Sequence, residues 1–336
     1  MKAFPENLRN ETLSRGLAAY GITPTALTYA PVGFGDHHWN VTGGDGREWF
    51  VTVSDLEHKA HCGADATTAG VGLRRAMDTA LTLRAHDGLD FVVAPVEATD
   101  GGSVVPLGER YALTVFPHVT GRTGEFGDRL DDADRDRVLG VLARLHGATP
   151  PATTPATTLE PAGLTGVHAA LDDLTGTWSG GPYAEPARRL LAAHATTLRA
   201  RTAEFDALAD RVRRGGAPLV VTHGEPHPGN LIQGADGYLL VDWDTVGLAL
   251  PERDLSLLAD DPVALAHYAR LTGRTPDAAA LALYRLRWSL LDVAEFTEWF
   301  RGPHEETDDT RVAWDGFAGT LEQLADRSRD AVIDSN

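Results

Sequence analysis

The residues most able to do chemistry lie together between positions 223 and 244. This segment holds His223, Glu225, Asn230 and Asp242, and its prolines and glycines prevent a continuous helix between the first three. Oxygen ligands suit magnesium, which neutralises charge on the β- and γ-phosphates of a nucleotide, while a nearby carboxylate can orient and deprotonate an attacking hydroxyl group. We therefore predict a phosphoryl-transfer site, with Asn230 and Asp242 holding Mg²⁺ and Glu225 facing the acceptor.

Other chemistries fit this segment less well. His223 and His227 flank Glu225 as in a zinc hydrolase, but ligands four residues apart need a helix, which the intervening prolines forbid. A zinc deaminase also has a His-x-Glu pair, yet it requires paired cysteines, and Cys62 is the only cysteine of the chain. The remaining alternative is a set of polar loop residues satisfied by the backbone.

The elements around this segment are expected to be short strands. Residues 231–244 are typical of two strands around an Asp236-Gly237 turn, preceded by a strand at 218–222. Alternation and glycine turns favour an antiparallel sheet nearer the N-terminus. Strands are predicted within residues 27–53, 91–98, 102–107 and 111–116, and helices over 64–86 and 131–148. Helices dominate the rest, so the fold class is α+β.

Composition narrows the class of partner. The formal charge of −18 disfavours binding to nucleic acid, which needs a basic face. That acidity would attract a cationic small substrate, although it also serves simply to keep a surface soluble. No run approaches the roughly 20 apolar residues of a membrane span, and the N-terminal stretch lacks the apolar core of a secretory signal. We expect a cytoplasmic protein without membrane contacts, as a monomer or homodimer.

A resemblance to a known family rests on one motif and its sequel. The motif is His223-x-Glu225-x4-Asn230, followed twelve residues later by Asp242-Trp243-Asp244, with the run 252–255 (Glu-Arg-Asp-Leu) downstream. It resembles the catalytic and metal segment of the aminoglycoside-phosphotransferase family, and the downstream run is similar to that of spectinomycin-type phosphotransferases.

The resemblance implies a bilobal, protein-kinase-like α+β fold. A small antiparallel-sheet lobe would bind nucleotide over residues 1–116, and a larger, mainly helical lobe over residues 117–336 would hold the catalytic and substrate-binding residues. The cofactors would be ATP and Mg²⁺, and the acceptor a hydroxyl group of an aminoglycoside-like antibiotic or related sugar. Antibiotic resistance would be the biological role.

The same resemblance assigns individual residues. His223 and Glu225 would be the catalytic residues, and Asp254 a buried support for their loop. The hinge against adenine would be formed by Val115, Phe116 and Pro117. Asp244 is grouped with the residues near the substrate.

Two departures from the family pattern stand out. Glu225 replaces the usual aspartate, which extends the carboxylate by roughly 1.5 Å, and a misplacement of about 1 Å can cost about a hundredfold in rate. Thr52 stands where a phosphate-binding lysine is expected, and losing a charge about 4 Å from phosphate forfeits about 4 kcal/mol at an effective dielectric near 20. Lys59 is the nearby lysine that could replace it, with Arg74, Arg75, His37 and His38 as other candidates.

Two further features bear on ligands. Gly33 and Gly35 could form a turn that covers the phosphates, because glycine lets backbone approach a nucleotide closely. Along residues 281–300, a stripe opposite the apolar helix face could hold an ammonium group by ion pairing and cation–π contact. Its members are Trp288, Asp292, Glu295 and Trp299. The alternative is a solvated acidic face with packed tryptophans.

The function that fits these features is an ATP- and Mg²⁺-dependent phosphotransferase acting on a hydroxylated small molecule. A nucleotide-binding protein that has lost catalysis and serves a regulatory role is the rival hypothesis, and the two departures are its basis. The acceptor, the choice between ATP and GTP, and the hydroxyl that is phosphorylated are left open by the residues.

Overall fold

The structure is a computed structural model that describes residues 1–5, 8–86, 88–259 and 261–333. The described helices are α1 (Asn10–Ala18), α2 (Ala66–His86), α3 (Asp132–His146), α4 (Leu164–Asp172), α5 (Ala184–Ala193), α6 (Ala195–Gly215), α7 (Glu252–Leu255), α8 (Pro262–Thr272), α9 (Ala278–Arg301) and α10 (Asp308–Ile333), with 3₁₀ turns η1 (Leu56–His58) and η2 (Pro228–Asn230). The described strands are β1 (Pro24–Ala30), β2 (His37–Gly43), β3 (Glu48–Asp55), β4 (Val105–Leu107), β5 (Tyr111–Pro117), β6 (Arg122–Thr123), β7 (Val220–Thr222), β8 (Leu231–Gly234), β9 (Gly237–Leu240) and β10 (Gly247–Ala249).

The chain divides into two compact units. The first contains residues 1–157 and 218–277, and the second contains residues 158–217 together with the chain from residue 278 onward. The predicted lobe boundary after residue 116 lies inside the first unit and stays a prediction. Along the described chain, none of the helices combines the length and the apolar character needed to cross a membrane.

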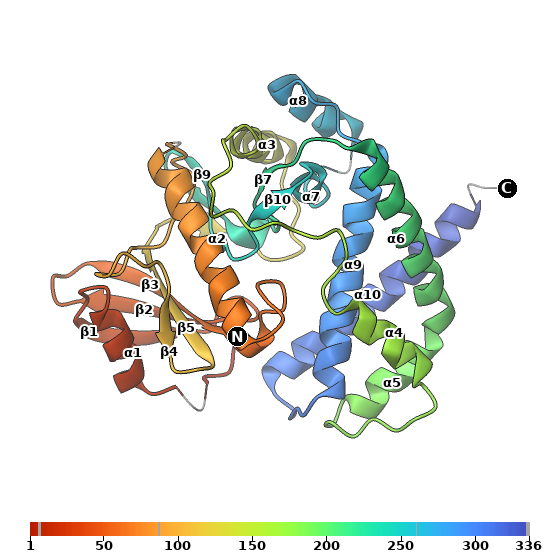
Figure 1. The fold of residues 1–336 in the computed structure, drawn as a ribbon, viewed down its shortest axis with the longest axis horizontal. Helices are drawn as coiled ribbons and strands as arrows, with labels where there is room; N and C mark the ends of the chain where they lie inside the picture. The colour runs from red at the N-terminus through yellow and green to blue at the C-terminus, as the bar shows by residue number, and fades with distance from the viewer. Residues whose placement is uncertain (6–7, 87, 260, 334–336) are drawn as a thin grey trace. The chain divides into compact units, whose positions relative to one another are not determined.

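The first unit carries an antiparallel sheet of five strands in the order β1-β2-β3-β5-β4 (Figure 1). Its members alternate in burial, so that Val51 and Val53 enter an apolar core with Trp39 and with Leu13 and Leu17 of α1. Because successive strand residues point to opposite faces, Thr52 and Ser54 lie on the other face. The antiparallel sheet predicted from the sequence is confirmed, and its second face carries the polar residues discussed below.

One predicted strand is wrong. Residues 91–98 form an irregular connection, in which a single bridge joins Val92 to Leu240. Their backbone groups have scattered partners, since Val93 N–H donates to Leu240 while Val96 N–H donates to Val115. Pro95 lacks an N–H and cannot contribute to a regular ladder. An apolar run was therefore mistaken for a strand because periodicity alone cannot tell which backbone partners are within reach.

Two smaller sheets of the first unit surround the motif. β8 and β9 form the expected hairpin in the three-stranded sheet β6-β8-β9. Its two-residue turn is Ala235-Asp236, one residue earlier than the predicted Asp236-Gly237, because Gly237 already pairs with Gly234 as the first residue of β9. β7 pairs antiparallel with β10. The segment 223–230 therefore runs from the end of β7 into β8, and the motif aspartates follow the end of β9.

The second unit is helical, with α4, α5, α6, α9 and α10 around one apolar core. The predicted apolar face of the helix at 281–300 is confirmed, because its members are all buried there: Leu283, Leu286, Leu290, Val293 and Phe300. The mixed α+β class predicted from the sequence, with an antiparallel sheet first and helices later, is also confirmed.

Candidate active site

The loop from residue 223 to residue 230 is held by one buried carboxylate, that of Asp254 in α7. Asp254 Oδ2 accepts from the His223 N–H at 2.8 Å, and Oδ1 accepts from the Gly224 N–H at 2.7 Å. The carboxylate is completely buried. Burial opposes its ionisation, but the hydrogen bond and charge of His146 outweigh burial and lower the pKa of Asp254. The predicted role of Asp254 as a buried support for the loop is confirmed.

A second layer holds Asp254 in turn. His146 Nε2 lies 3.0 Å from Asp254 Oδ2, and His146 Nδ1 lies 2.8 Å from the Tyr268 hydroxyl. His146 ends α3 and Tyr268 belongs to α8, so two helices that pack together fix the orientation of the carboxylate. The start of the loop is thus fastened to the helical layer of the first unit.

Gly224 is required at its position for two separate reasons. Its φ of +104° lies in the region that glycine alone tolerates easily. A Cβ there would also stand 2.5 Å from Arg253 Nη2, whose guanidinium group donates to the Thr222 hydroxyl and the Thr245 carbonyl. Arg253 therefore cannot move away from an added Cβ without losing its hydrogen bonds to Thr222 and Thr245.

We expect Gly224→Ala to lower the free energy of unfolding by about 2 kcal/mol or more, because backbone strain of about 1–3 kcal/mol adds to the clash. Urea unfolding followed by circular dichroism measures it. Gly46→Ala is the matched control, since Gly46 has a φ of +79° but nothing within 4 Å of its Cβ position. Equal losses in the two variants would show that the Arg253 contact contributes nothing.

His223 is a completely buried, neutral side chain. Its Nε2 donates to the Val241 carbonyl at 2.8 Å, and its Nδ1 accepts from the Glu225 N–H at 3.3 Å. Burial lowers the pKa of the ring. His223 therefore connects the backbone beside Glu225 to the residue that precedes Asp242, while Trp243 packs edge-on against its ring.

The two predicted metal ligands are Asn230, which directly precedes β8, and Asp242, which follows β9. The Asn230 amide nitrogen donates to the Glu225 carbonyl at 3.0 Å, which leaves its amide oxygen as the atom suited to a cation. Asp242 follows β9 with φ +64°, and no other non-glycine residue of the described chain has a positive φ. Protein atoms crowd its carboxyl group although the residue keeps an exposed surface, and this burial together with Asp244 raises the pKa of Asp242.

Asp244 has partners in the N-terminal part of the chain. Its Oδ2 contacts the Lys59 ammonium group and lies 3.2 Å from His61 Nε2. Burial opposes ionisation, but Lys59 and His61 outweigh it and lower the pKa of Asp244. The same carboxylate raises the pKa of His61 against the effect of burial. Asp244, which the sequence grouped with substrate residues, is therefore engaged by two cationic side chains.

The structure separates the candidates for the missing strand cation. The Thr52 hydroxyl lies 3.1 Å from His38 Nδ1, and burial lowers the pKa of His38 to about 4, so this ring is neutral near pH 7. Arg74 donates to the Val104 carbonyl, and Arg75 donates to the carbonyls of residues 153 and 154. Lys59, by contrast, contacts the Asp242-Trp243-Asp244 motif through Asp244.

Comparison with known proteins then settles the family. The model of the phosphotransferase enzyme family matches residues 27–299, which include the sheet, the loop and the motif aspartates. The chain belongs to the phosphotransferase enzyme family. Its relatives are small-molecule kinases with hydroxyl acceptors, and this protein is an enzyme of that kind. The family resemblance predicted from the motif is confirmed.

Individual proteins are similar to this chain in sequence or in fold. Protein StrN of Streptomyces griseus is 29% identical over 256 residues, which cover 69% of this chain and 72% of that protein. A spectinomycin phosphotransferase solved with ADP and spectinomycin superposes with a TM-score of 0.63 at 16% identity, covering 95% of this chain and 98% of that one. A microcompartment-associated aminopropanol kinase gives 0.60 at 16% identity, covering 94% and 97%.

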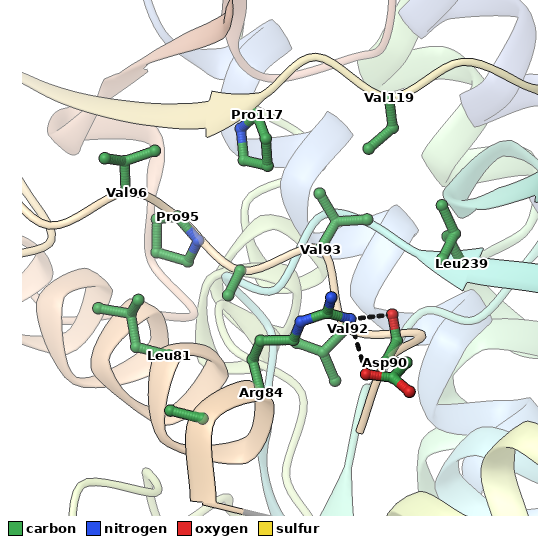
Figure 2. Close-up of a pocket in the computed structure, with 12 residues that line it drawn as sticks. Leu81, Arg84, Asp90, Val92, Val93, Pro95, Val96, Pro117, Val119 and Leu239 are labelled. Carbon is green, nitrogen blue, oxygen red and sulfur yellow. Dashed lines mark hydrogen bonds and ion pairs between the residues drawn. The ribbon is translucent and has the colours of Figure 1, made fainter. Parts of the chain in front are cut away.

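The predicted hinge of this phosphotransferase is the end of β5. Val115 is buried and its carbonyl accepts from Val96, whereas Phe116 is half-buried opposite Phe50 of β3. Pro117 is exposed and borders an apolar cavity of about 350 Å³ beside α2, with Val119 and Leu239 also on its wall (Figure 2). Arg84 and Asp90 pair at its edge. Apart from Pro117, the cavity wall contains none of the predicted site residues.

The predicted ammonium-binding stripe lies on α9 in the second unit. Trp299 packs against the helical core and stacks on Phe300, and Asp292 accepts from the Thr320 hydroxyl at 3.4 Å. Trp288 is half-buried and Glu295 is exposed. Trp299 therefore has a packing role, while a substrate role for the stripe stays a prediction.

Three residues of the site were not predicted from the sequence. They are Asp36, His61 and His146. His61 lies two residues from Lys59, and Asp36 directly follows Gly35, so closeness to predicted residues was the available signal. His146 lies far from the motif in the chain, and no local pattern marks it.

Proposed function

We propose that this phosphotransferase transfers the γ-phosphate of ATP, with Mg²⁺, to a hydroxyl group of an aminoglycoside-like antibiotic or related sugar. The observation that carries the proposal is the loop held by Asp254, which presents Glu225 and Asn230 from one strand end while Asp242 leaves the neighbouring hairpin. Known relatives bind adenine nucleotides, which supports nucleotide use. We place the enzyme in the cytoplasm, and antibiotic resistance is the role that this acceptor class would give it.

The donor set fits magnesium. Magnesium prefers oxygen ligands and is held in kinases by one or two protein side chains together with substrate phosphates. Asn230 and Asp242 supply an amide and a carboxylate oxygen. Burial and Asp244 raise the pKa of Asp242, so a positive charge beside it would favour its ionised form. Bound magnesium would supply that charge and would neutralise the β- and γ-phosphates.

Glu225 is the residue we place against the acceptor. The acceptor oxygen forms a bond to the γ-phosphorus, the bond to the β–γ bridging oxygen breaks, and the acceptor proton passes to the Glu225 carboxylate. Because the transition state of phosphoryl transfer is largely dissociative, orientation of the hydroxyl group matters more than early proton removal. This tolerance allows glutamate where relatives of this motif usually carry aspartate. His223 contributes by positioning Glu225 through its backbone.

Lys59 is the cation we place at the nucleotide phosphates. It takes the role left open at Thr52, because its ammonium group already lies against the motif through Asp244. Gly33 and Gly35, with φ values of +70° and +94°, would form the turn over the phosphates. Val115, Phe116 and Pro117 would line the adenine site. The apparent loss of a phosphate-binding lysine is then a relocation, which removes one of the two arguments for a non-catalytic protein.

We also propose a ligand-binding role for the α9 stripe. Trp288, Asp292 and Glu295 offer indole and carboxylate groups suited to an ammonium-bearing molecule. Trp299 would support this stripe from the helical core. A neutral sugar would use the same polar groups as hydrogen-bond acceptors.

Turnover with defined acceptors tests the proposal. Purified protein with Mg·ATP is offered aminoglycosides, spectinomycin, nucleosides and sugars, and ADP release and phosphorylated product are measured. We expect turnover with at least one member, and Glu225→Gln should lower kcat by about a hundredfold or more. Glu109→Gln, which changes an exposed glutamate, is the matched control and should be neutral. Nucleotide binding with no turnover of any acceptor would favour the regulatory alternative, and no binding of Mg·ATP would exclude both.

A further inference from the structure

The ammonium group of Lys59 lies between two carboxylates. Its Nζ is 2.9 Å from Asp36 Oδ2 and also contacts Asp244 Oδ2. The lysine is 6% exposed. Burial by itself would lower the pKa of Lys59, but Asp244 and Asp36 outweigh burial and raise it well above its usual value. Lys59 is therefore a buried side chain whose ammonium group is held from two sides.

The two carboxylates belong to different parts of the site. Asp244 follows the catalytic hairpin and is shared with His61. Asp36 directly follows the glycine turn at Gly35 and precedes β2, and its Oδ2 accepts from the Ser54 hydroxyl at 3.1 Å. Asp36 thus ties Lys59 to the sheet, on the face opposite the α1 core.

Asp36 is also incompletely satisfied. The residue is 6% exposed, and its Oδ1 has no hydrogen-bond partner within the described part of the chain. A buried carboxylate oxygen without a partner costs roughly 1–3 kcal/mol, more when it is charged. A neutral side chain of similar size would fill this space without the cost of an unpaired carboxylate oxygen. The presence of Asp36 beside the buried ammonium group therefore points to a role in positioning Lys59.

In the described chain, the expected lysine position on β3 supplies no cation, and helix α2 supplies no carboxylate to Lys59. The strand position Thr52 is bonded to His38. Helix α2 contains one acidic residue, Asp78, and this carboxylate accepts from the Ser103 hydroxyl at 2.5 Å. In protein kinases, a strand lysine paired with a helix glutamate must be in place for phosphoryl transfer. In this protein, both the lysine and its carboxylate partner would have to come from segments outside that strand position and that helix.

We propose that Asp36 is a positioning residue that holds Lys59 beside the glycine turn, where the nucleotide phosphates would be bound. Without Asp36, the ammonium group would pair with Asp244 alone and would be drawn away from the sheet. Compared with the protein-kinase arrangement, the lysine would then lie after β3 instead of on a strand. Its carboxylate partner would follow the glycine turn instead of lying on a helix. This inference rests on the proposed nucleotide site.

A double-mutant cycle tests the inference by calorimetric titration of the full-length protein with ADP, in magnesium and in chelator. We expect Asp36→Asn and Lys59→Met each to raise the dissociation constant about tenfold. Because Asp36 would act through Lys59, adding Asp36→Asn to the Lys59→Met protein should change the constant by less than about twofold. Asp45→Asn, which removes an exposed carboxylate paired with Arg47, is the control and should bind like the parent.

Two outcomes would overturn the inference: wild-type affinity in Asp36→Asn, or a full additional loss when it is combined with Lys59→Met. If Asp36→Asn does not fold, Ser54→Ala removes the brace of Asp36 and should weaken ADP binding about twofold to threefold, whereas no change there would contradict the role. A parent protein that binds no ADP would instead refute the proposed function, so the two failures are distinguishable.

Discussion

Asp242→Asn should abolish turnover while making the protein more stable. We expect kcat to fall by about a thousandfold or more, because loss of the proposed metal ligand would remove several kcal/mol of transition-state stabilisation. The free energy of unfolding should rise at neutral pH, since burial and Asp244 raise the pKa of Asp242 and its ionised form is therefore disfavoured in the folded state. Asparagine also accepts the left-handed backbone at φ +64°. ADP release and thermal unfolding in chelator measure the two effects.

Asp242→Ala provides the comparison. Alanine removes the same charge and the same ligand but is poorly suited to a left-handed backbone, at a cost of about 1–2 kcal/mol. It should be as inactive as Asp242→Asn and less stable. Turnover within about tenfold of the parent in either variant would rule out Asp242 as a metal ligand.

Asp254→Ala should produce the largest loss of stability. The change leaves the N–H groups of His223 and Gly224 and the Nε2 of His146 without their acceptor in a fully buried place. Breaking a buried charged network of this kind costs about 3–5 kcal/mol. Urea unfolding measures the loss, and kcat should fall as well because the loop that carries Glu225 loses its support.

Asp90→Ala is the control for that loss. Asp90 is exposed and pairs with Arg84 at 3.6 Å, so its removal should change stability by no more than about 1 kcal/mol. A loss in Asp254→Ala no greater than this would mean that the loop is held by other contacts. Full activity in a destabilised Asp254→Ala protein would show that the network serves folding alone.

The motif segment could be predicted because its information is local. Prolines exclude a helix between His223 and Asn230, and the hairpin brings Asp242 back beside them through a two-residue turn. These short-range constraints favour a loop and hairpin that bring the donors near one another. The antiparallel sheet was predictable for the same reason, since strand alternation and glycine turns act within a few residues.

Prediction failed where partners are distant in the chain. The run 91–98 has strand-like composition, but its backbone bonds go to β5 and to the hairpin, and only the folded chain shows this. His146 supports Asp254 across 108 residues of sequence. The contact between Lys59 and Asp244, across 185 residues, was likewise not predicted.

The sequence by itself determined the class of chemistry of this phosphotransferase. The identity and spacing of the oxygen donors require no knowledge of what packs around them. Tertiary structure alone decided which cation lies against Asp244 and what holds the loop. A charge acts through distance and burial, and both depend on contacts between segments far apart in the chain. Lys59 is one of two lysines in the sequence, and only its burial between Asp36 and Asp244 distinguishes it from a surface residue.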